Sequence, residues 1–492
     1  MGEKDPTGEL GKVAEIIPDL PDPDAGLSEE ERQAIEKKLM WKLDMALIPW
    51  LTILYLLAFL DRANIGNAKI AGLSHDLGLS TSQFNATLTI FFVSYSVFEP
   101  LTNVLLKRLR PSRFIATIMV LWGLNMTFMG FVHNWSGLMA ARWFLGLTEA
   151  GLFPGINYYL SCWYKRSELG IRVAIFFSAA AISGSFGGLL AAAIEQMDGV
   201  GGKAGWAWIF ILEGALTVLF GIASFWFVYD FPAEAKFLTE PERARVIRRL
   251  VSDNQSVGQE HFSWPILRSA LLDWKMYLGA LIYSGITTPL YSFSIFLPTI
   301  IQDLGWSTSV VQTQLYSVPP YVAAALLTVV VGYLADRTRT RGIYNLASSV
   351  VGMVGFIMLI ASKNPGIKYG GTFLGAIGIY PCISNTITWV ANNVEGSYRR
   401  GVILGFVIGW GNLNGIVSSN IYFSGPTYFE GHGVVLGFMA VFLFGGSALM
   451  MVLLKMENGK RQRGERDVWV EGKDDKVVRD MGDLRPDFIY TL

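Results

Sequence analysis

Charged side chains are scarce in this sequence. Asp, Glu, Lys and Arg make up 16% of its 492 residues, whereas roughly 25% is usual for a soluble domain. Basic and acidic residues balance, with 40 of each, so the basic surface that nucleic-acid binding requires is not expected. The scarcity of charge excludes an ordinary soluble domain, and the balance excludes nucleic acid as a partner.

Cysteine and histidine are also rare. The two cysteines, Cys162 and Cys382, lie in or beside apolar segments, and the four histidines are scattered along the chain. These numbers and spacings exclude a disulfide scaffold and a zinc cluster. The sequence also lacks the motifs of a nucleophile elbow or a phosphate-binding loop. We therefore expect neither an enzyme nor a metal or organic cofactor.

Apolar residues are abundant instead. They make up 52% of the chain, which also holds 52 Gly and 15 Trp, a composition that suits helices packed in lipid. A helix that crosses a bilayer needs about 20 apolar residues. The sequence predicts an all-α membrane protein with twelve such spans in two halves of six: 45–64, 83–106, 114–133, 136–160, 171–195, 206–230, 274–300, 314–335, 343–362, 369–391, 401–424 and 433–455.

The polar segments complete the predicted domain organisation. Residues 1–40 are acidic, polar and rich in proline, and we expect a disordered tail there rather than a signal peptide. The six-span halves then occupy residues 41–230 and 274–455, and residues 456–492 form a second tail. A soluble linker, 231–273, joins the halves and contains a predicted amphipathic helix near 239–252.

The distribution of Lys and Arg predicts the orientation. One set of alternate connections, which includes both tails, holds 33 of the 40 basic residues, and the other set holds five. Because basic residues remain on the cytoplasmic side, both termini are expected there. Asp61 and Arg62, in FLDRANIGNA (59–68), are then expected near the outer end of the first span.

A second pair of charges lies inside the fourth span. Arg142 and Glu149, in ARWFLGLTEAGLFPG (141–155), are seven residues apart and so share one helix face. Each central charge costs about 2.5–3.5 kcal/mol on insertion scales. These residues either form an ion pair that only joins helices, or surround a cavity between the halves with Asp61 and Arg62. In the second case the arginines hold an anion and the carboxylates carry protons.

Other polar or aromatic residues in the spans are weaker candidates. Asn412 and Asn414 are two residues apart, so they cannot both face one cavity. Glu99 precedes Pro100 and is interpreted as marking a kink, and Glu213 is interpreted as structural. Glu195 and Lys275 lie at span ends and are expected to reach the interface. The remaining candidates for substrate contact are Tyr283, Tyr291, Phe293, Asn385 and Trp410.

The loop after the eighth span, GYLADRTRTR (332–341), resembles the signature of the major facilitator transporters, Gly-x-Leu-Ala-Asp-Arg-x-Gly-Arg-Arg. The resemblance implies that Gly332 allows close helix approach and that Asp336 and Arg337 bridge neighbouring helices, with Arg341 closing the motif. Arg339 stands where the signature has Gly. Alone, such a charged loop could be only a topology signal.

Three longer segments, 59–73, 142–188 and 389–415, resemble the anion:cation symporters, and among them the fungal allantoate and nicotinate permeases. The resemblance implies proton coupling by Asp61 and Glu149 and carboxylate binding by Arg62 and Arg142. It implies a monomeric plasma-membrane carrier that takes up a small organic anion, such as nicotinate, allantoate or pantothenate, with protons. A proton-antiport exporter of an acidic metabolite and a nutrient receptor that signals without transport remain alternatives.

Overall fold

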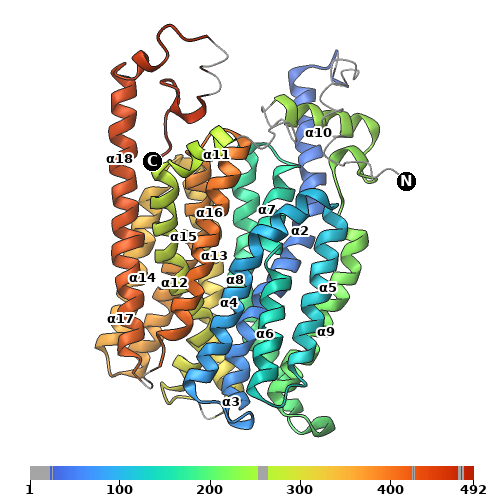
Figure 1. Cartoon of the computed structure of the whole chain (residues 1–492), viewed down its shortest axis with the longest axis vertical. Coiled ribbons are helices and arrows are strands. Elements are labelled where there is room, and N and C mark those ends of the chain that lie inside the picture. Colours follow the sequence, from blue (N-terminus) through green and yellow to red (C-terminus); the bar gives the residue numbers. More distant parts are fainter. Residues whose placement is uncertain are drawn as a thin grey trace.

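The computed structural model describes residues 23, 24, 26–252, 264–307, 309–423, 425, 427–474, 478 and 481–492, and these are helical or irregular, without a strand. Figure 1 shows two helical bundles side by side, with the start of the helix at Glu29 and the C-terminus of the chain on one face of the molecule. We call this the termini face and the other the opposite face. Within these residues, ten helical segments are long and apolar enough to cross a membrane.

Each of the twelve expected spans falls on a helix or on consecutive helices. The first half contains α2 (Glu29–Ile70), α4 (Thr81–Arg108), α5 (Pro111–Met129), α6 (Trp135–Glu149) with α7 (Leu152–Ser161), α8 (Arg166–Ile194) and α9 (Gly205–Phe227). The second half contains α12 (Trp274–Gln302), α13 (Val310–Thr338), α14 (Gly342–Ala361), α15 (Pro365–Asn392), α16 (Ser397–Asn420) and the run α17 (Phe429–Phe438), η5 (Met439–Gly445) and α18 (Gly446–Gln462). Short α3 (Leu73–Asp76) follows α2, while α10 (Glu240–Ser252) and α11 (Trp264–Leu271) lie in the linker, α10 where the amphipathic helix is predicted.

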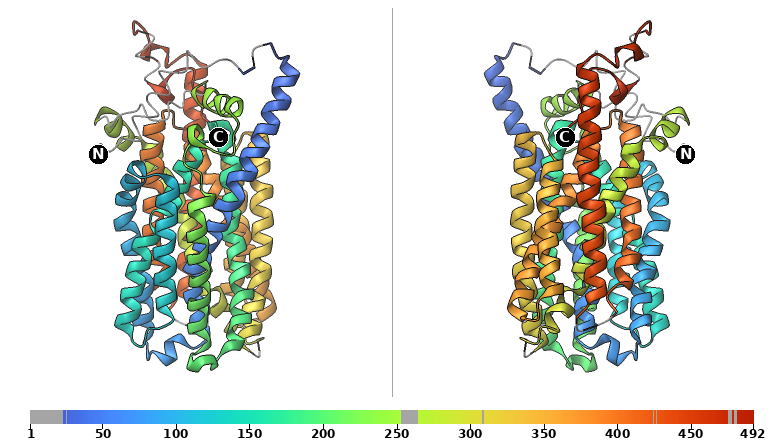
Figure 2. Two further views of the ribbon diagram at one scale, coloured as in Figure 1. Left: turned by 90° about the vertical axis from the view of Figure 1, so that its right-hand side faces the viewer. Right: turned by 90° about the vertical axis from the view of Figure 1, so that its left-hand side faces the viewer.

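Helix α2 is longer than predicted at both ends. It begins at Glu29 because Ser28 and Glu31 form a capping box and the first turn is acidic. Residues 29–40, assigned above to the disordered tail, are therefore helical. A helix of 42 residues is about 63 Å long, and its N-terminal part projects beyond the bundle at the termini face (Figure 2).

The position of Asp61 and Arg62 also differs from the prediction. Because α2 continues to Ile70, Asp61 lies about 13 Å along the helix from its C-terminal end. Both side chains are buried, at 0% and 8% exposure. They are in the interior of the first span, and the expectation that they lie near its outer end is wrong.

The two halves meet near the opposite face. A Cβ on Gly188, late in α8, would lie 2.7 Å from the Gln314 carbonyl oxygen, early in α13. On the same helices Ser185 donates to the Val318 carbonyl (3.3 Å), and elsewhere Asn420, at the end of α16, donates to Thr89 of α4 (2.8 Å). By contrast, at Gly401 and Gly405, near the termini face on α16, an added Cβ would meet no atom of the described residues within 4 Å.

The end of α13 explains the glycine in the transporter signature. Arg339 is the C-cap of this helix and adopts φ 52° and ψ 28°, the left-handed conformation. Glycine reaches that conformation freely, whereas other residues incur a steric cost of roughly 1–2 kcal/mol. The turn is thus retained here in spite of the substitution.

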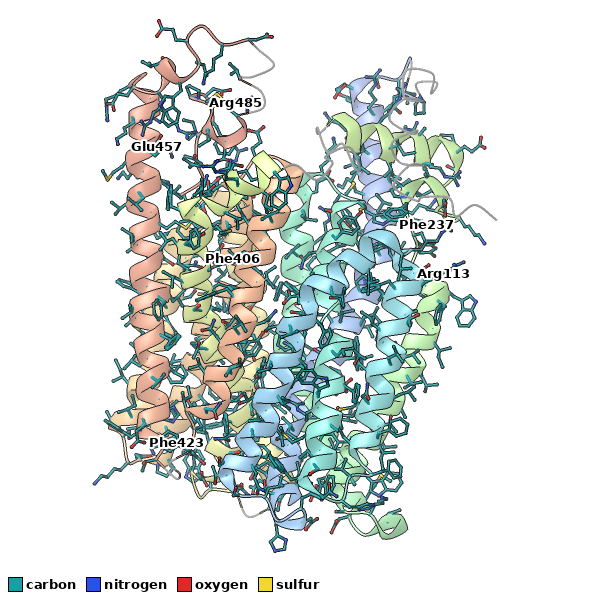
Figure 3. All side chains as sticks on the ribbon, in the orientation of Figure 1. Arg113, Phe237, Phe406, Phe423, Glu457 and Arg485 are labelled. Carbon is teal, nitrogen blue, oxygen red and sulfur yellow. The ribbon has the colours of Figure 1, made fainter. Side chains whose placement is uncertain are left out.

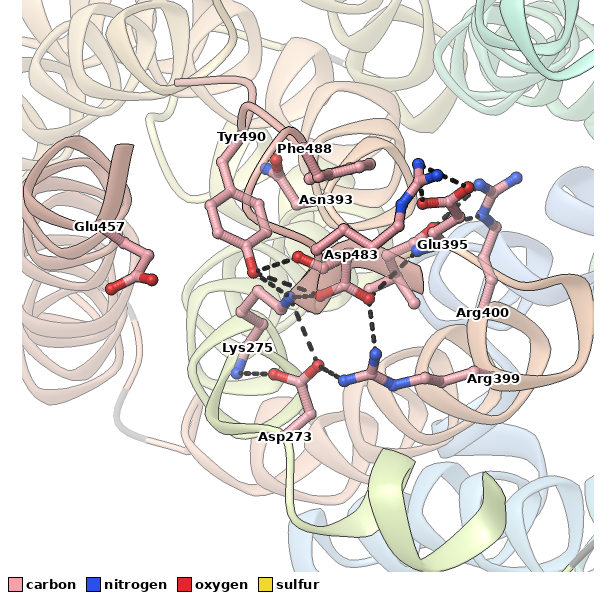
Figure 4. A network of polar contacts seen from close by, with 12 residues as sticks. Asp273, Lys275, Asn393, Glu395, Arg399, Arg400, Glu457, Asp483, Phe488 and Tyr490 are labelled. Carbon is pink, nitrogen blue, oxygen red and sulfur yellow. Dashed lines mark hydrogen bonds and ion pairs between the residues drawn. The ribbon is translucent and has the colours of Figure 1, made fainter. Parts of the chain in front are cut away.

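The C-terminal segment, residues 481–492, packs on the second half at the termini face. Helix α18 continues to Gln462, past the boundary predicted at 455. Figure 4 shows Asp483 between Lys275 of α12 and Arg399 of α16. Asp483 forms an ion pair with Lys275 and another with Arg399 (2.6 Å), while Arg399 also pairs with Asp273 (2.7 Å). Lys275 is only 2% exposed, so the expectation that it reaches the interface is wrong.

The rest of the same segment extends these contacts. Tyr490 accepts a hydrogen bond from Arg461 (2.8 Å), and Thr491 accepts one from Trp389 (2.9 Å). Figure 3 places Arg485 of this segment and Glu457 of α18 at the termini face, and Phe423 at the opposite face. The segment thereby holds together the ends of several helices of the second half.

Candidate functional site

Arg62 lies between the two halves and is the centre of the site. Its Nε and Nη2 donate to Glu149 Oε1, at 3.1 and 2.5 Å, and its Nη1 donates to the Tyr291 hydroxyl of the second half, at 3.4 Å. The rings of Phe59, Phe91, Tyr95 and Tyr291 have their centroids within 5.7 Å of the guanidinium. These rings exclude water from the Arg62–Glu149 ion pair while leaving π faces toward it.

Arg142 lies beside this pair and makes fewer hydrogen bonds than Arg62. Its side chain is 0% exposed, and its guanidinium carbon lies 4.6 Å from the centroid of the Phe91 ring. Its Nε donates to the Thr87 carbonyl at 3.3 Å, but Nη1 and Nη2 have no hydrogen-bond partner among the residues that the structure describes. A buried cation with two unpartnered donors is costly unless an anion binds to it.

Gly146 explains how α6 presents Arg142 and Glu149. This residue lies between them in sequence, and a Cβ there would overlap the Phe91 carbonyl and the Ser94 hydroxyl of α4. Only glycine lets α6 approach α4 so closely. The close approach brings Arg142 over the Phe91 ring and directs Glu149 toward Arg62.

The second half completes the site through two residues. Tyr291 of α12 donates to Asn412 Oδ1 of α16 at 2.8 Å, and Asn412 Nδ2 donates to Glu99 Oε2 of α4 at 2.9 Å. A hydrogen-bonded chain therefore runs from Arg62 through Tyr291 and Asn412 to Glu99, crossing between the halves twice. Tyr283 is also buried and packs against the backbone of Gly411 on α16.

Glu99 is the site residue that sequence reasoning missed. It is 4% exposed and contacts Asn412, whereas the sequence interpretation assigned it to a kink before Pro100. A carboxylate in the middle of an apolar segment was the available signal, because such residues are expensive in a membrane and usually functional.

Asp61 does not join the other three charges. Its Oδ2 accepts hydrogen bonds from Trp122 of α5 (2.8 Å) and Thr217 of α9 (2.9 Å), both within the first half. Successive residues on a helix point about 100° apart, so Asp61 and Arg62 face different neighbours. The prediction that four charges surround one cavity is therefore wrong for Asp61.

Two further candidates also lie elsewhere. Asn385 contacts Arg341 and Asn345, accepting from Arg341 Nη1 at 3.2 Å, so it belongs with the loop motif at the termini face. Trp410 is 44% exposed and donates to Ser284 at 3.0 Å. Asn414 donates to the same Ser284, so Asn412 and Asn414 face different partners, as their spacing requires.

The loop motif forms a compact polar cluster. Asp336 and Arg341 make an ion pair, and Arg341 and Asn385 are hydrogen-bonded across α13–α14 and α15. Arg337 is exposed and Gly332 is half-buried.

Phe293 is another candidate for substrate contact. It packs against Tyr321 of α13, with ring centroids 5.8 Å apart, rather than against the charged residues.

The positive charge of Arg142 favours an anion beside it. Arg62 and Glu149 neutralise each other. The charged residues that remain are Arg142, beside this pair, and the acid Glu99, at the far end of the hydrogen-bonded chain. A carboxylate on Arg142 could form the paired, charge-assisted hydrogen bonds that guanidinium groups favour. Within the described ranges, no group of His, Cys, Asp and Glu could hold a metal ion.

Comparison with known proteins identifies the family. Residues 51–419 match the family model of the Major Facilitator Superfamily. The chain belongs to this superfamily. The all-helical transporter fold predicted from the sequence is thereby confirmed, and the protein is a multi-pass membrane transporter of small molecules rather than an enzyme.

Fungal transporters and a solved bacterial structure are among the proteins that this chain resembles. An uncharacterized transporter of Schizosaccharomyces pombe is 37% identical over 92% of this chain and 91% of its own length. The high-affinity nicotinic acid transporter of Saccharomyces cerevisiae is 30% identical over 93% of this chain and 85% of its own. A bacterial homolog of the human lysosomal transporter Spinster, crystallised in an inward-facing and occupied conformation, has the same fold, with a TM-score of 0.61 at 15% identity, over 82% of this chain and 95% of its own.

Proposed function

We propose that this transporter is a proton-coupled symporter of the anion:cation type that imports a small organic carboxylate across the plasma membrane. The observation that carries the proposal is Arg142, a fully buried guanidinium with two unpartnered donor nitrogens beside the Arg62–Glu149 pair. Nicotinate-, allantoate- and pantothenate-like acids are the proposed class. The 30% identity to a nicotinic acid transporter supports this choice.

The aromatic surroundings suit a small, flat acid. Phe91 lies against both guanidinium groups, at 5.4 Å from Arg62 and 4.6 Å from Arg142, and Tyr291 lies 4.8 Å from Phe92. Such rings can stack on an aromatic substrate while its carboxylate binds Arg142. Tyr291 and Asn412 bring neutral hydrogen-bonding groups from the second half.

Coupling between the proton and the substrate follows because Glu149 and the substrate carboxylate compete for Arg62. When a substrate carboxylate bound to Arg142 also draws Arg62 away from Glu149, the Glu149 carboxylate loses its counter-ion and gains affinity for a proton. A monoanion that enters with one proton uses only the pH gradient, about 1.36 kcal/mol per pH unit. A second proton would give the complex a positive charge and add ~2.3 kcal/mol per 100 mV.

We further propose that the termini face is cytoplasmic, because 33 of the 40 basic residues lie in the connections on that side. The contacts between the halves near the opposite face then close the outer side. The open space over Gly401 and Gly405 belongs to the cytoplasmic side. The conformation is accordingly inward-facing.

Two glycine substitutions test this assignment. Gly188→Leu should wedge α8 from α13 and favour the outward-facing state, because overpacking costs about 1–3 kcal/mol. Gly405→Leu fills space that must close in the outward-facing state and should favour the inward-facing one. An Asn67→Cys reporter, buried near the opposite face, should react with an impermeant maleimide about ten-fold faster in the first variant than in the second, a difference of ~1.4 kcal/mol.

The control is the parent protein, whose two cysteines, Cys162 and Cys382, are buried and free, and which should label slowly. Equal labelling of the reporter in both variants would contradict the inward-facing assignment. Faster labelling in Gly405→Leu would reverse it.

Uptake measurements test the function itself. Cells that express the transporter should accumulate one radiolabelled acid from a panel of nicotinate, allantoate and pantothenate. Accumulation should rise at acid external pH, by about ten-fold per pH unit of gradient for one proton, and an uncoupler should abolish it. Efflux of a preloaded acid without accumulation would favour the exporter. Substrate-dependent signalling without either flux would favour the receptor.

A further inference from the structure

Two buried carboxylates occupy the interior of the first half, away from Arg62. Asp61 of α2 is 0% exposed and accepts from Trp122 and Thr217, at 2.8 and 2.9 Å. Glu213 of α9 is 1% exposed and accepts a hydrogen bond from Asn64 of α2. One oxygen of each carboxylate, Asp61 Oδ1 and Glu213 Oε1, has no hydrogen-bond partner within the described residues.

The two acids belong to one cluster. Asp61 and Asn64 are about one turn apart on α2, and Glu213 and Thr217 are about one turn apart on α9. The contacts Asp61–Thr217 and Asn64–Glu213 run in opposite directions along the two helices, as the antiparallel first and sixth spans require. The carboxylates are therefore neighbours on facing helices.

Their charge is not compensated. In the described part of the chain, the donors to these two acids are an indole, a hydroxyl and an amide, all neutral. The titratable groups that interact with Asp61 across its packed neighbours are Glu213 and Glu149, both acidic, and Glu149 is already held by Arg62. Two adjacent anions without a cation are too costly in this interior, and protonation is the way to neutralise them.

Helix α2 connects this cluster to the anion site. Asp61 and Arg62 are consecutive. The helix therefore carries a carboxylate on the side toward α5 and α9 and a guanidinium on the side toward α6 and α12. A rotation or shift of α2 that moves Arg62 toward a bound anion also moves Asp61 relative to Trp122 and Thr217.

The family resemblance already implies that Asp61 couples protons, and we propose that Glu213 is its partner, so that the two carboxylates share one proton at a site in the first half. This site is separate from the anion site and coupled to it through α2. The proposal rests on the proposed function for the role of the proton in transport. The proton is taken from water on one side of the membrane, converts one carboxylate to a carboxylic acid, and is released to water on the other side. Glu213, interpreted from the sequence as structural, becomes part of the transport machinery.

Infrared spectroscopy of the purified, full-length protein tests the site without requiring transport. At neutral pH the wild type should show a carbonyl band of a protonated carboxylic acid, and Asp61→Asn or Glu213→Gln should each diminish it. Thr217→Val, which removes only a donor to Asp61, should shift the band without removing it. A spectrum that keeps the whole band in both acid variants would overturn the proposal.

Reconstituted vesicles test the coupling. In Asp61→Asn and Glu213→Gln, accumulation driven by a pH gradient should fall further than substrate exchange does, by the about ten-fold that one pH unit can drive. Equal loss of both activities in variants that retain the wild-type unfolding temperature would overturn coupling through this site. If a variant does not fold, the wild-type protein provides the test. Addition of the transported acid should shift its carboxylic-acid carbonyl band, and an unchanged band would refute coupling.

The two experiments separate the site from the proposed function. If none of the acids is transported, the infrared result still establishes or refutes the proton site. If an acid is transported without dependence on pH, the symport mechanism fails while the band can persist.

Discussion

Arg142→Ala should weaken binding of the transported acid by at least about 100-fold, or ~2.7 kcal/mol. Removal of this guanidinium deletes the two unpartnered donors that we assign to the substrate carboxylate. The remaining arginine, Arg62, is held by Glu149 at 2.5 Å. The dissociation constant in detergent, measured by scintillation proximity or calorimetry, reports this loss directly.

Arg142→Lys is the matched control. It keeps the positive charge but loses the planar fork, so an intermediate loss of about ten-fold is expected. Neither variant should unfold the protein, because the substituted side chain makes a single hydrogen bond, to the Thr87 carbonyl. Wild-type affinity in Arg142→Ala would show that the acid binds elsewhere.

Asp483→Asn should lower the free energy of unfolding by about 3–5 kcal/mol, the usual effect of breaking a buried ion pair. In the wild type, the charges of Asp273 and Asp483 balance those of Lys275 and Arg399 in a network with little exposure to solvent. The substitution leaves one positive charge uncompensated. Thermal unfolding of the detergent-solubilised protein should therefore begin at a lower temperature.

The same segment offers a control for this experiment. Asp487 is four residues further along, and its side chain is 74% exposed. Asp487→Asn should change stability by less than about 0.5 kcal/mol. If both variants unfold at one temperature, the contacts of Asp483 do not stabilise the second half.

Composition and span length sufficed to predict the fold, and the cost of buried charge singled out most of the site. Arg62, Arg142 and Glu149 are few and conspicuous in apolar segments, and they meet as expected. Tyr291 and Asn412 also join them. Periodicity could not fix the rotation of α2 about its axis, so the direction of Asp61 was not predictable.

The remaining differences arise from contacts between residues distant in sequence. Lys275 and Asp483 are separated by 208 positions, and nothing local to either one indicates that they pair. Asn385 and Trp410 lie in the correct helices, but packing turns Asn385 to Arg341 and Trp410 to Ser284. Hydropathy records how apolar a segment is and carries no information about such partners.

The contacts between the halves near the opposite face have an electrical consequence. Glycine backbones close this side together with hydrogen bonds between neutral groups, such as Ser185 with Val318 and Asn420 with Thr89. Opening these hydrogen bonds separates only neutral groups, whereas Lys69 of α2, which lies over the Phe296 ring of α12 and interacts with Asp303, is a charged residue at the same contact. Membrane voltage should therefore act on this opening step through Lys69, and on the rest of the cycle through Arg142 and its bound cargo.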